Sequence, residues 1–406
     1  MKKTLLICRE YPLPEDHGSS MRTMNFVRFF RNYGTIDIAY SFVPNNTPGG
    51  DSIFSKEYFL ENKGPSKSFK RLLISGFLKG VPVPVYDIGN ASQRYILTLI
   101  KDNDYDYIFV RYARNADVLF RGEKKYKIKT IVDFDDILSG SLYESRFGSV
   151  KGWHKKYVLG LNKKRLLNYE RNCLNFGASL FCSEKDKAEL VKENQRKDTF
   201  IVPNIYNNES FENFDFEDGF KKGNILLFVG ALGWGPNKVG LRWFIETVFP
   251  DFKKKYSDAK LLVVGRSPAS YVRELCENRD GIELYVDVPD VKVYYNQCRA
   301  IVVPLLAGSG TRIKILEAAL ANTPVLSTPK GAEGLDLVDQ TDVLLFRNSR
   351  EFCFKYNKLL DRDSYNSLIC NAKDAVARRY SVQQFNDLME QVLRVIDHKK
   401  FNMAFK

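Results

Sequence analysis

Histidine is scarce in this sequence, which has three in 406 residues: His17, His154 and His398. The seven cysteines show neither a CxxC nor a CxxxH spacing, and they stand at positions 8, 173, 182, 276, 298, 353 and 370. Zinc sites need clusters of Cys and His at short, regular spacings, so the pattern excludes such a site. Scattered cysteines of this kind are typical of reduced thiols in a cytoplasmic protein.

Long apolar runs are also missing. The first one, Thr4 to Cys8, follows Met1-Lys2-Lys3 and ends at Arg9. Secretory cores are longer, and a membrane span needs roughly 18–20 apolar residues, so neither is expected here. With 44% hydrophobic and 27% charged residues, the composition indicates a soluble globular protein, and the length suits two domains.

The positive charge is distributed unevenly. Residues 1–205 hold 34 Lys and Arg against 23 Asp and Glu, whereas residues 206–406 hold 28 against 26. Two segments of the first half, 62–86 and 146–171, are rich in Lys and Arg and also carry apolar residues such as Leu72, Ile74 and Trp153. Each is either a basic amphipathic surface for anionic lipid or a solvated helix whose apolar stripe joins the core.

Short apolar, β-branched runs alternate with helical stretches along the whole chain, which is typical of parallel strands with crossover helices. The pattern predicts two doubly wound α/β domains of six strands each. They are expected at 1–205 and 223–380, joined by a polar linker at 206–222 and facing a cleft at the carboxyl ends of their strands. Helical spacing recurs in residues 381–406, a final helix that either caps its own domain or crosses back to the first.

One local motif carries chemistry. Strand Ala300 to Pro304 leads into Gly308-Ser309-Gly310-Thr311 and then a helix, so free backbone N–H groups and the positive end of the helix dipole meet at one point. Such a point binds phosphate, and Arg312 and Lys314 add positive charge. Glu317 follows in the same helix, where its carboxylate can accept hydrogen bonds from ribose hydroxyls when a diphosphate occupies the helix N-terminus.

Three runs extend this motif: LLFVGALGWGPNKVGLRWF, LLVVGRSP and VVPLLAGSGTRIKILEAALANTPVLSTPKGAEGL. Together they resemble the donor domain of the family-4 retaining glycosyltransferases of GT-B fold, notably bacterial transferases of exopolysaccharide and surface-glycan clusters. The likeness is close over 225–335 and looser at YPLPEDHGSSMR, VDFDDILS and VPN.

The resemblance implies roles for individual residues of the second domain. Glu317 matches the second Glu of the family's Glu, seven residues, Glu motif, whereas the first Glu is replaced by Ser309. Donor binding is then expected at one set of residues: Gly230, Lys238, Arg266, Ser309, Gly310, Thr311, Arg312, Lys314 and Glu317.

In the first domain, Gly18 and Arg22 match the family's loop near donor phosphate and acceptor. Asp135, Asp136 and Arg111 fall where relatives carry groups near the transferred sugar, so they are the candidate catalytic residues. A carboxylate there can stabilise positive charge or accept the acceptor's proton. The family uses the helix dipole and basic side chains in place of a divalent cation, so no metal and no cofactor are expected.

The sequence therefore predicts a hexosyltransferase that moves a sugar from a UDP- or GDP-sugar to a glycan or lipid-linked acceptor in surface polysaccharide synthesis. It is expected in the cytoplasm, with peripheral association at the inner, anionic membrane face, and no nucleic acid is expected as a partner. Three alternatives remain: a nucleotide-sugar 2-epimerase of the same fold, a basic nucleic-acid-binding protein, and an inactive homologue, which the Ser309 replacement keeps open.

Overall fold

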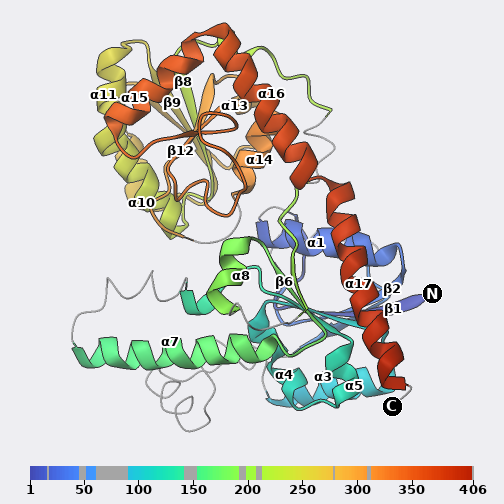
Figure 1. The fold of residues 1–406 in the computed structure, drawn as a ribbon. Coiled ribbons are helices and arrows are strands. Elements are labelled where there is room, and N and C mark those ends of the chain that lie inside the picture. The colour runs from blue at the N-terminus through green and yellow to red at the C-terminus, as the bar shows by residue number, and fades with distance from the viewer. Residues whose placement is uncertain are drawn as a thin grey trace. The chain divides into compact units, whose positions relative to one another are not determined.

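The computed structural model describes residues 1–15, 18–44, 52–60, 90–140, 153–191, 198–206, 213–277, 279–308 and 312–404. The described chain divides into two compact units (Figure 1). Unit 1 comprises Met1–Asn204 and Phe385–Lys406, and unit 2 comprises Ile205–Gln384. Each unit is a parallel sheet with helices, which confirms the predicted α/β class.

Unit 1 contains a seven-stranded parallel sheet in the order β3-β2-β1-β4-β5-β6-β7. Its strands are β1 (Lys2–Ile7), β2 (Gly34–Tyr40), β3 (Lys56–Phe59), β4 (Tyr107–Arg111), β5 (Thr130–Asp133), β6 (Ala178–Phe181) and β7 (Thr199–Ile201). The prediction of six strands was wrong here, because it missed β3. That strand is four residues long, lies at the sheet edge and exposes most of its side chains, so it lacks the apolar run that marks the other strands.

The helices of unit 1 follow the strands as crossovers. They are α1 (Gly18–Arg31), α3 (Asn90–Asp102), η2 (Ala113–Ala116), α4 (Asp117–Phe120), α5 (Lys124–Ile128), α7 (Trp153–Cys173) and α8 (Glu184–Leu190). Among the described helices, none combines the length and apolar composition that crossing a bilayer requires.

The C-terminal helix α17 (Val382–Ala404), red in Figure 1, packs on unit 1 from Phe385 onward. The ring of Phe385 lies 5.1 Å from that of Phe26 on α1. Further along, Asp397 accepts a hydrogen bond from the Tyr107 hydroxyl at 2.8 Å, and the Lys399 ammonium donates to the Gly177 carbonyl. The last helix of the chain therefore belongs to the core and surface of unit 1.

Unit 2 contains a six-stranded parallel sheet in the order β10-β9-β8-β11-β12-β13. The strands are β8 (Ile225–Val229), β9 (Lys260–Gly265), β10 (Ile282–Val286), β11 (Ala300–Val303), β12 (Val325–Ser327) and β13 (Leu344–Leu345). The helices are η3 (Gly219–Lys221), α10 (Gly235–Trp243), η4 (Phe244–Val248), α11 (Phe249–Lys255), α12 (Ser270–Cys276), α13 (Lys292–Tyr295), α14 (Ile313–Leu320), α15 (Ser349–Asn357), η5 (Lys358–Leu360) and α16 (Arg362–Arg379).

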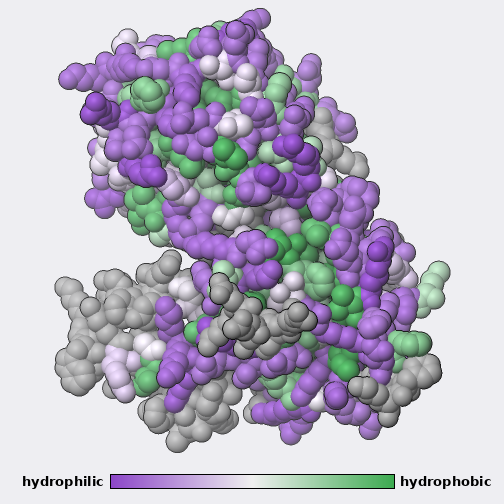
Figure 2. Space-filling model, in the orientation of Figure 1, coloured by the Kyte–Doolittle hydropathy of each residue, from purple (hydrophilic) through white to green (hydrophobic). Residues whose placement is uncertain are grey.

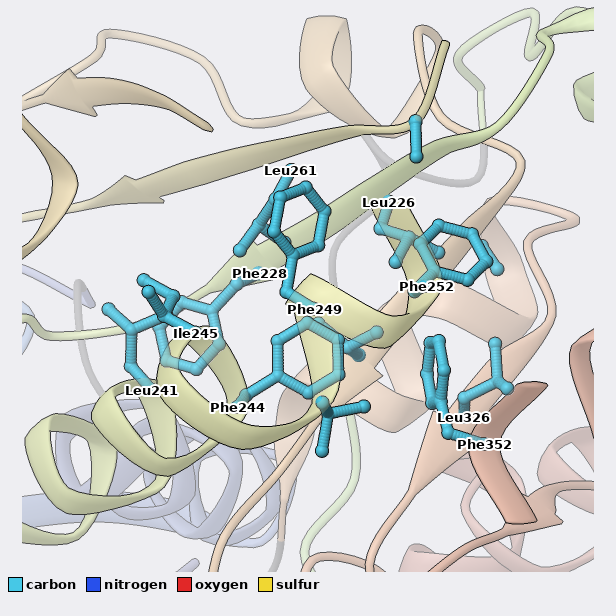
Figure 3. Packing of buried hydrophobic residues seen from close by; sticks show 14 of the residues in the cluster. Leu226, Phe228, Leu241, Phe244, Ile245, Phe249, Phe252, Leu261, Leu326 and Phe352 are labelled. Atoms are coloured by element: carbon cyan, nitrogen blue, oxygen red, sulfur yellow. The ribbon is translucent and has the colours of Figure 1, made fainter. Parts of the chain in front are cut away.

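The core of unit 2 is built from aromatic and aliphatic side chains that the helices press onto the sheet (Figure 3). Phe244, Phe249 and Phe252 come from the continuous run α10, η4 and α11, and they face Leu226 and Leu261 on the strands. Burying a side chain of this size contributes about 1.5–3 kcal/mol, so these residues hold η4 and α11 against the sheet. The visible face in Figure 2 is mostly hydrophilic, with small hydrophobic areas between.

Candidate active site

The strand order of unit 2 creates a switch point between β8 and β11. From β8 the chain moves outward to β9 and β10, then returns to the other side of β8 as β11. The connections that follow β8 and β11 run to opposite sides along the sheet, so the carboxyl edge between these two strands is open to a ligand. Both following helices, α10 and α14, begin at this edge, and each presents backbone N–H groups and a positive dipole end there.

Lys314, in the first turn of α14, is directed at the end of β8. Its ammonium donates to the Val229 carbonyl and, at 3.3 Å, to the amide oxygen of Asn237 on α10. Gly230 makes room for it, because a Cβ at that position would lie 2.8 Å from Lys314 Nζ. Burial and the neighbouring Arg312 together lower the pKa of Lys314 to about 8, although Glu317 opposes this shift. A bound anion such as a diphosphate would favour the charged form of the lysine and so offset the cost of its burial.

Glu317 lies one turn further along α14. Its Oε2 accepts a hydrogen bond from the Tyr295 hydroxyl at 3.1 Å, and Tyr206 also bonds to it. Burial raises the pKa of Glu317, and these two hydroxyls and Lys314 partly oppose that rise. The carboxylate is therefore oriented in advance on the same helix as the cation.

Arg312 is the N-cap residue of α14 and is 5% exposed. Its Nη2 donates to the Gly308 carbonyl at 3.0 Å. Lys238 lies in the first turn of α10 and is partly buried, whereas Arg266 follows β9 and is exposed. The structure thus brings Gly230, Lys314 and Arg312 together with Glu317, and it places Lys238 and Arg266 on neighbouring elements of the same sheet edge. The predicted Ser309, Gly310 and Thr311 lie outside the described residues.

Unit 1 has the same kind of switch point between β1 and β4, and a buried charge network occupies its carboxyl edge. Arg22 on α1 and Arg111 at the end of β4 both donate to the carboxylate of Asp133, with Arg22 Nη2 at 2.6 Å. Arg111 also donates to Asp135 at 2.9 Å, and Arg22 to the Asn204 side chain at 2.8 Å. The two arginines and Asp133 are at most 2% exposed. Two cations and two anions thus neutralise one another in the interior.

This network sets the pKa of Asp135, one of the predicted catalytic residues. Burial raises the pKa of Asp135, but Arg111 and Arg22 outweigh it and lower the pKa to about 2. A carboxylate with so low a pKa is a poor proton acceptor near neutral pH. Asp136, the next residue, is only partly buried. Arg111 contacts Asp135 and Asp133, so the geometry gives it a positioning role, and Arg22 is buried in the same way. Gly18, the first residue of α1, is exposed.

Sequence reasoning missed residues that orient the ones it found. Asn237 holds Lys314, Tyr295 holds Glu317, and Asp133 joins the two arginines of unit 1. Only Asn237 has a local signal, because it lies next to the Trp-Gly-Pro run at a helix start. Within the described residues, no group of three or more His, Cys, Asp or Glu could hold a metal ion.

Part of the chain matches a known family. Residues 223–362 match the family model of glycosyl transferases group 1, and that segment contains β8 through η5, with Gly230, Arg312, Lys314 and Glu317. A protein in the cps region of Klebsiella pneumoniae, described as an uncharacterized 44.6 kDa protein, is 24% identical over 85% of this chain and 89% of its own length.

Solved structures share the fold over nearly the whole chain. Sucrose-phosphate synthase from Thermosynechococcus elongatus is 16% identical, covers 98% of this chain with all of its own, and has a TM-score of 0.71. WaaG, a glycosyltransferase involved in lipopolysaccharide biosynthesis, is 14% identical over 97% of this chain and 99% of its own, with a TM-score of 0.65. HepE of Anabaena, solved with UDP, is 13% identical over 97% of this chain and all of its own, with a TM-score of 0.64.

The two parallel-sheet units, together with the similarity to these solved structures, show that the protein has the GT-B fold. The match of residues 223–362 to group 1 glycosyl transferases, taken together with these neighbours, identifies the chain as a glycosyltransferase.

Proposed function

We propose that the chain transfers a hexose from a UDP- or GDP-sugar to a glycan or lipid-linked acceptor in surface polysaccharide synthesis. One observation carries the donor part: a partly buried lysine and an oriented carboxylate lie one turn apart on α14, at the switch point of unit 2. The lysine suits a diphosphate, and the carboxylate suits the ribose hydroxyls. Retention of the anomeric configuration is the expectation that comes with the family resemblance.

The relatives support the same donor and pathway. HepE was solved with UDP and also with UDP-glucose, WaaG acts in lipopolysaccharide biosynthesis, and the Klebsiella relative is encoded in a cps region. In this proposal the diphosphate leaving group gains negative charge during transfer, and Lys314, Arg312 and the N-termini of α10 and α14 stabilise it. In unit 1, Asp136 is the better candidate to accept the acceptor's proton, because Arg111 and Arg22 lower the pKa of Asp135 to about 2.

Turnover is expected to persist without divalent metal. Arg312, Lys314 and two helix dipoles supply the positive charge that a cation would otherwise provide. The measurement is release of nucleoside diphosphate from a nucleotide-sugar in EDTA, compared with the same assay in magnesium or manganese. Loss of turnover in EDTA that either metal restores would contradict this mechanism, and absence of release under every condition would contradict the enzyme assignment itself.

We also propose that the acceptor is met at an anionic membrane surface. The basic helix α7 belongs to unit 1, and its Lys164 is exposed, while the basic segment 62–86 lies outside the described residues. Basic residues near an anionic membrane contribute about 1 kcal/mol each, so binding should be reversible and sensitive to salt.

Co-sedimentation with vesicles that contain anionic lipid tests this proposal. The protein should pellet at low salt and not at high salt, and replacing four lysines of α7 with Gln should weaken pelleting: Lys155, Lys156, Lys163 and Lys164. A matched control removes the same charge from unit 2 at exposed positions: Lys221, Lys254, Lys255 and Lys260. If the wild type stays in the supernatant at low salt, or both variants lose pelleting equally, α7 is not the membrane-binding surface.

A further inference from the structure

An indole ring stands exposed beside the phosphate-binding end of unit 2. Trp234 is the N-cap residue of α10, and 43% of its surface is exposed. Tryptophan is large and highly buried on average in folded proteins, so this exposed indole offers a flat surface that a ligand at the neighbouring site can contact.

The ring is fixed in place along one side. A Cβ on Gly308 would lie 3.1 Å from Trp234 Cη2 and 3.0 Å from Pro236 Cγ, so the glycine backbone packs against both rings. Gly308 also has φ +105°, a conformation that side chains other than that of glycine rarely adopt. The Arg312 guanidinium lies 6.0 Å from the centre of the indole ring. The tryptophan is therefore a rigid, half-exposed platform, which costs little conformational entropy to use.

The order of the groups along α14 indicates which part of the ligand contacts the indole ring. Glu317, Lys314 and Arg312 follow one another toward the helix N-terminus, and Trp234 lies just beyond, at Gly308. Five residues of helix span about 7.5 Å. A nucleotide-sugar has the same order of parts: ribose, diphosphate and sugar ring. With the ribose at Glu317 and the diphosphate at Lys314 and Arg312, the sugar ring reaches the indole.

We propose that Trp234 stacks on the sugar ring of the donor and favours sugars that present an apolar C–H face. This inference rests on the proposed function, because it uses the same donor orientation. A pyranose has one face lined mainly by C–H groups, which packs on a flat aromatic ring, while its hydroxyls remain available to polar partners. Aromatic side chains with convergent polar groups are the usual lining of small-molecule sites.

Calorimetry on the full chain tests the proposal with two ligands, UDP-glucose or GDP-mannose and the matching free nucleoside diphosphate. Trp234→Ala should weaken binding of the nucleotide-sugar about tenfold, because the stacking surface is lost. It should change the affinity for the nucleoside diphosphate less than about twofold, since Lys314, Arg312 and Glu317 remain. Trp234→Phe keeps a ring and should recover most of the nucleotide-sugar affinity.

The control is Phe354→Ala, which removes an exposed aromatic side chain from α15 of the same unit and should leave both affinities unchanged. Equal weakening of both ligands in Trp234→Ala, or no weakening of either, overturns the stacking role. A higher KM for the acceptor in Trp234→Ala, with unchanged donor affinity, also overturns it and would show that the ring contacts the acceptor. If the wild type binds neither ligand, the donor site itself is wrong, which is a different failure from the loss of Trp234 selectivity.

Discussion

Replacing Lys314 with Met is expected to weaken donor binding about 100-fold, since hydrogen bonds to a charged group contribute about 1.5–3 kcal/mol. The same change should stabilise the protein. A gain in stability together with a loss of binding is the behaviour of a residue kept for function and not for folding.

The stability gain follows from the pKa of Lys314, which burial lowers from 10.5 to about 8. The folded protein thus binds this proton less tightly than the unfolded chain does, so the stability of the wild type rises as the pH increases from about 8 to 10.5. At neutral pH the buried cation costs about 3 kcal/mol. Methionine removes that cost. It also leaves the Val229 carbonyl and the Asn237 side chain without the hydrogen bonds that Lys314 donates, which lowers stability by about 1–2 kcal/mol. We therefore expect a net gain of about 1–2 kcal/mol.

Urea unfolding at pH 7 and pH 9.5, together with calorimetric titration of nucleoside diphosphate, checks both parts. The difference between Lys314→Met and the wild type should shrink at the higher pH, where the wild-type lysine is largely neutral in the folded state. Lys254→Met, an exposed lysine on α11, serves as control and should change neither quantity. Lower stability of Lys314→Met with unchanged binding would mean that this lysine is structural.

Replacing Asp133 with Asn is expected to destabilise the protein by about 3–5 kcal/mol, because it leaves buried cations without their anion. Asp133 is fully buried and accepts hydrogen bonds from Arg22 and Arg111, which have 1% exposed side chains. Asp135 alone would then face two guanidinium groups. The loss should also displace Asp135, since Arg111 positions both carboxylates.

Asp106→Asn is the matched control for this change. Asp106 lies just before β4 in the same unit and pairs with Lys2 at 3.1 Å, with side chains 31% and 44% exposed. Exposed pairs of this kind contribute about 0–1 kcal/mol, so the control should shift the urea midpoint only slightly. Equal shifts in Asp133→Asn and Asp106→Asn would show that the buried network does not stabilise unit 1.

Local patterns predicted most of the fold because strands such as β4 and β8 are continuous apolar runs that the interior of a parallel sheet requires. They missed β3, whose exposed edge position permits polar residues. The sequence also predicted a phosphate site at the N-terminus of α14, since a glycine loop, two cations and a carboxylate lie within ten residues of sequence.

The remaining parts of the candidate site depend on contacts far apart in sequence. Tyr295 meets Glu317 across 22 positions, and Asn237 meets Lys314 across 77. Arg111 shows the same limit: it is the last residue of β4, and only the packed structure reveals that Asp133 and Asp135 hold its guanidinium in the interior. No spacing rule connects residues that meet through the topology of a sheet.

We propose that α14 of unit 2 holds the nucleotide of the donor. Calorimetric titration of the wild type and Glu317→Ala with UDP- and GDP-sugars tests it most directly, with Glu274→Ala on α12 as an exposed-carboxylate control. At least one nucleotide-sugar is expected to bind the wild type and the control equally. Binding to Glu317→Ala should be roughly ten- to a hundred-fold weaker, because one charged hydrogen-bond partner of the ribose is lost. Equal affinity of wild type and a folded Glu317→Ala protein would contradict the claim.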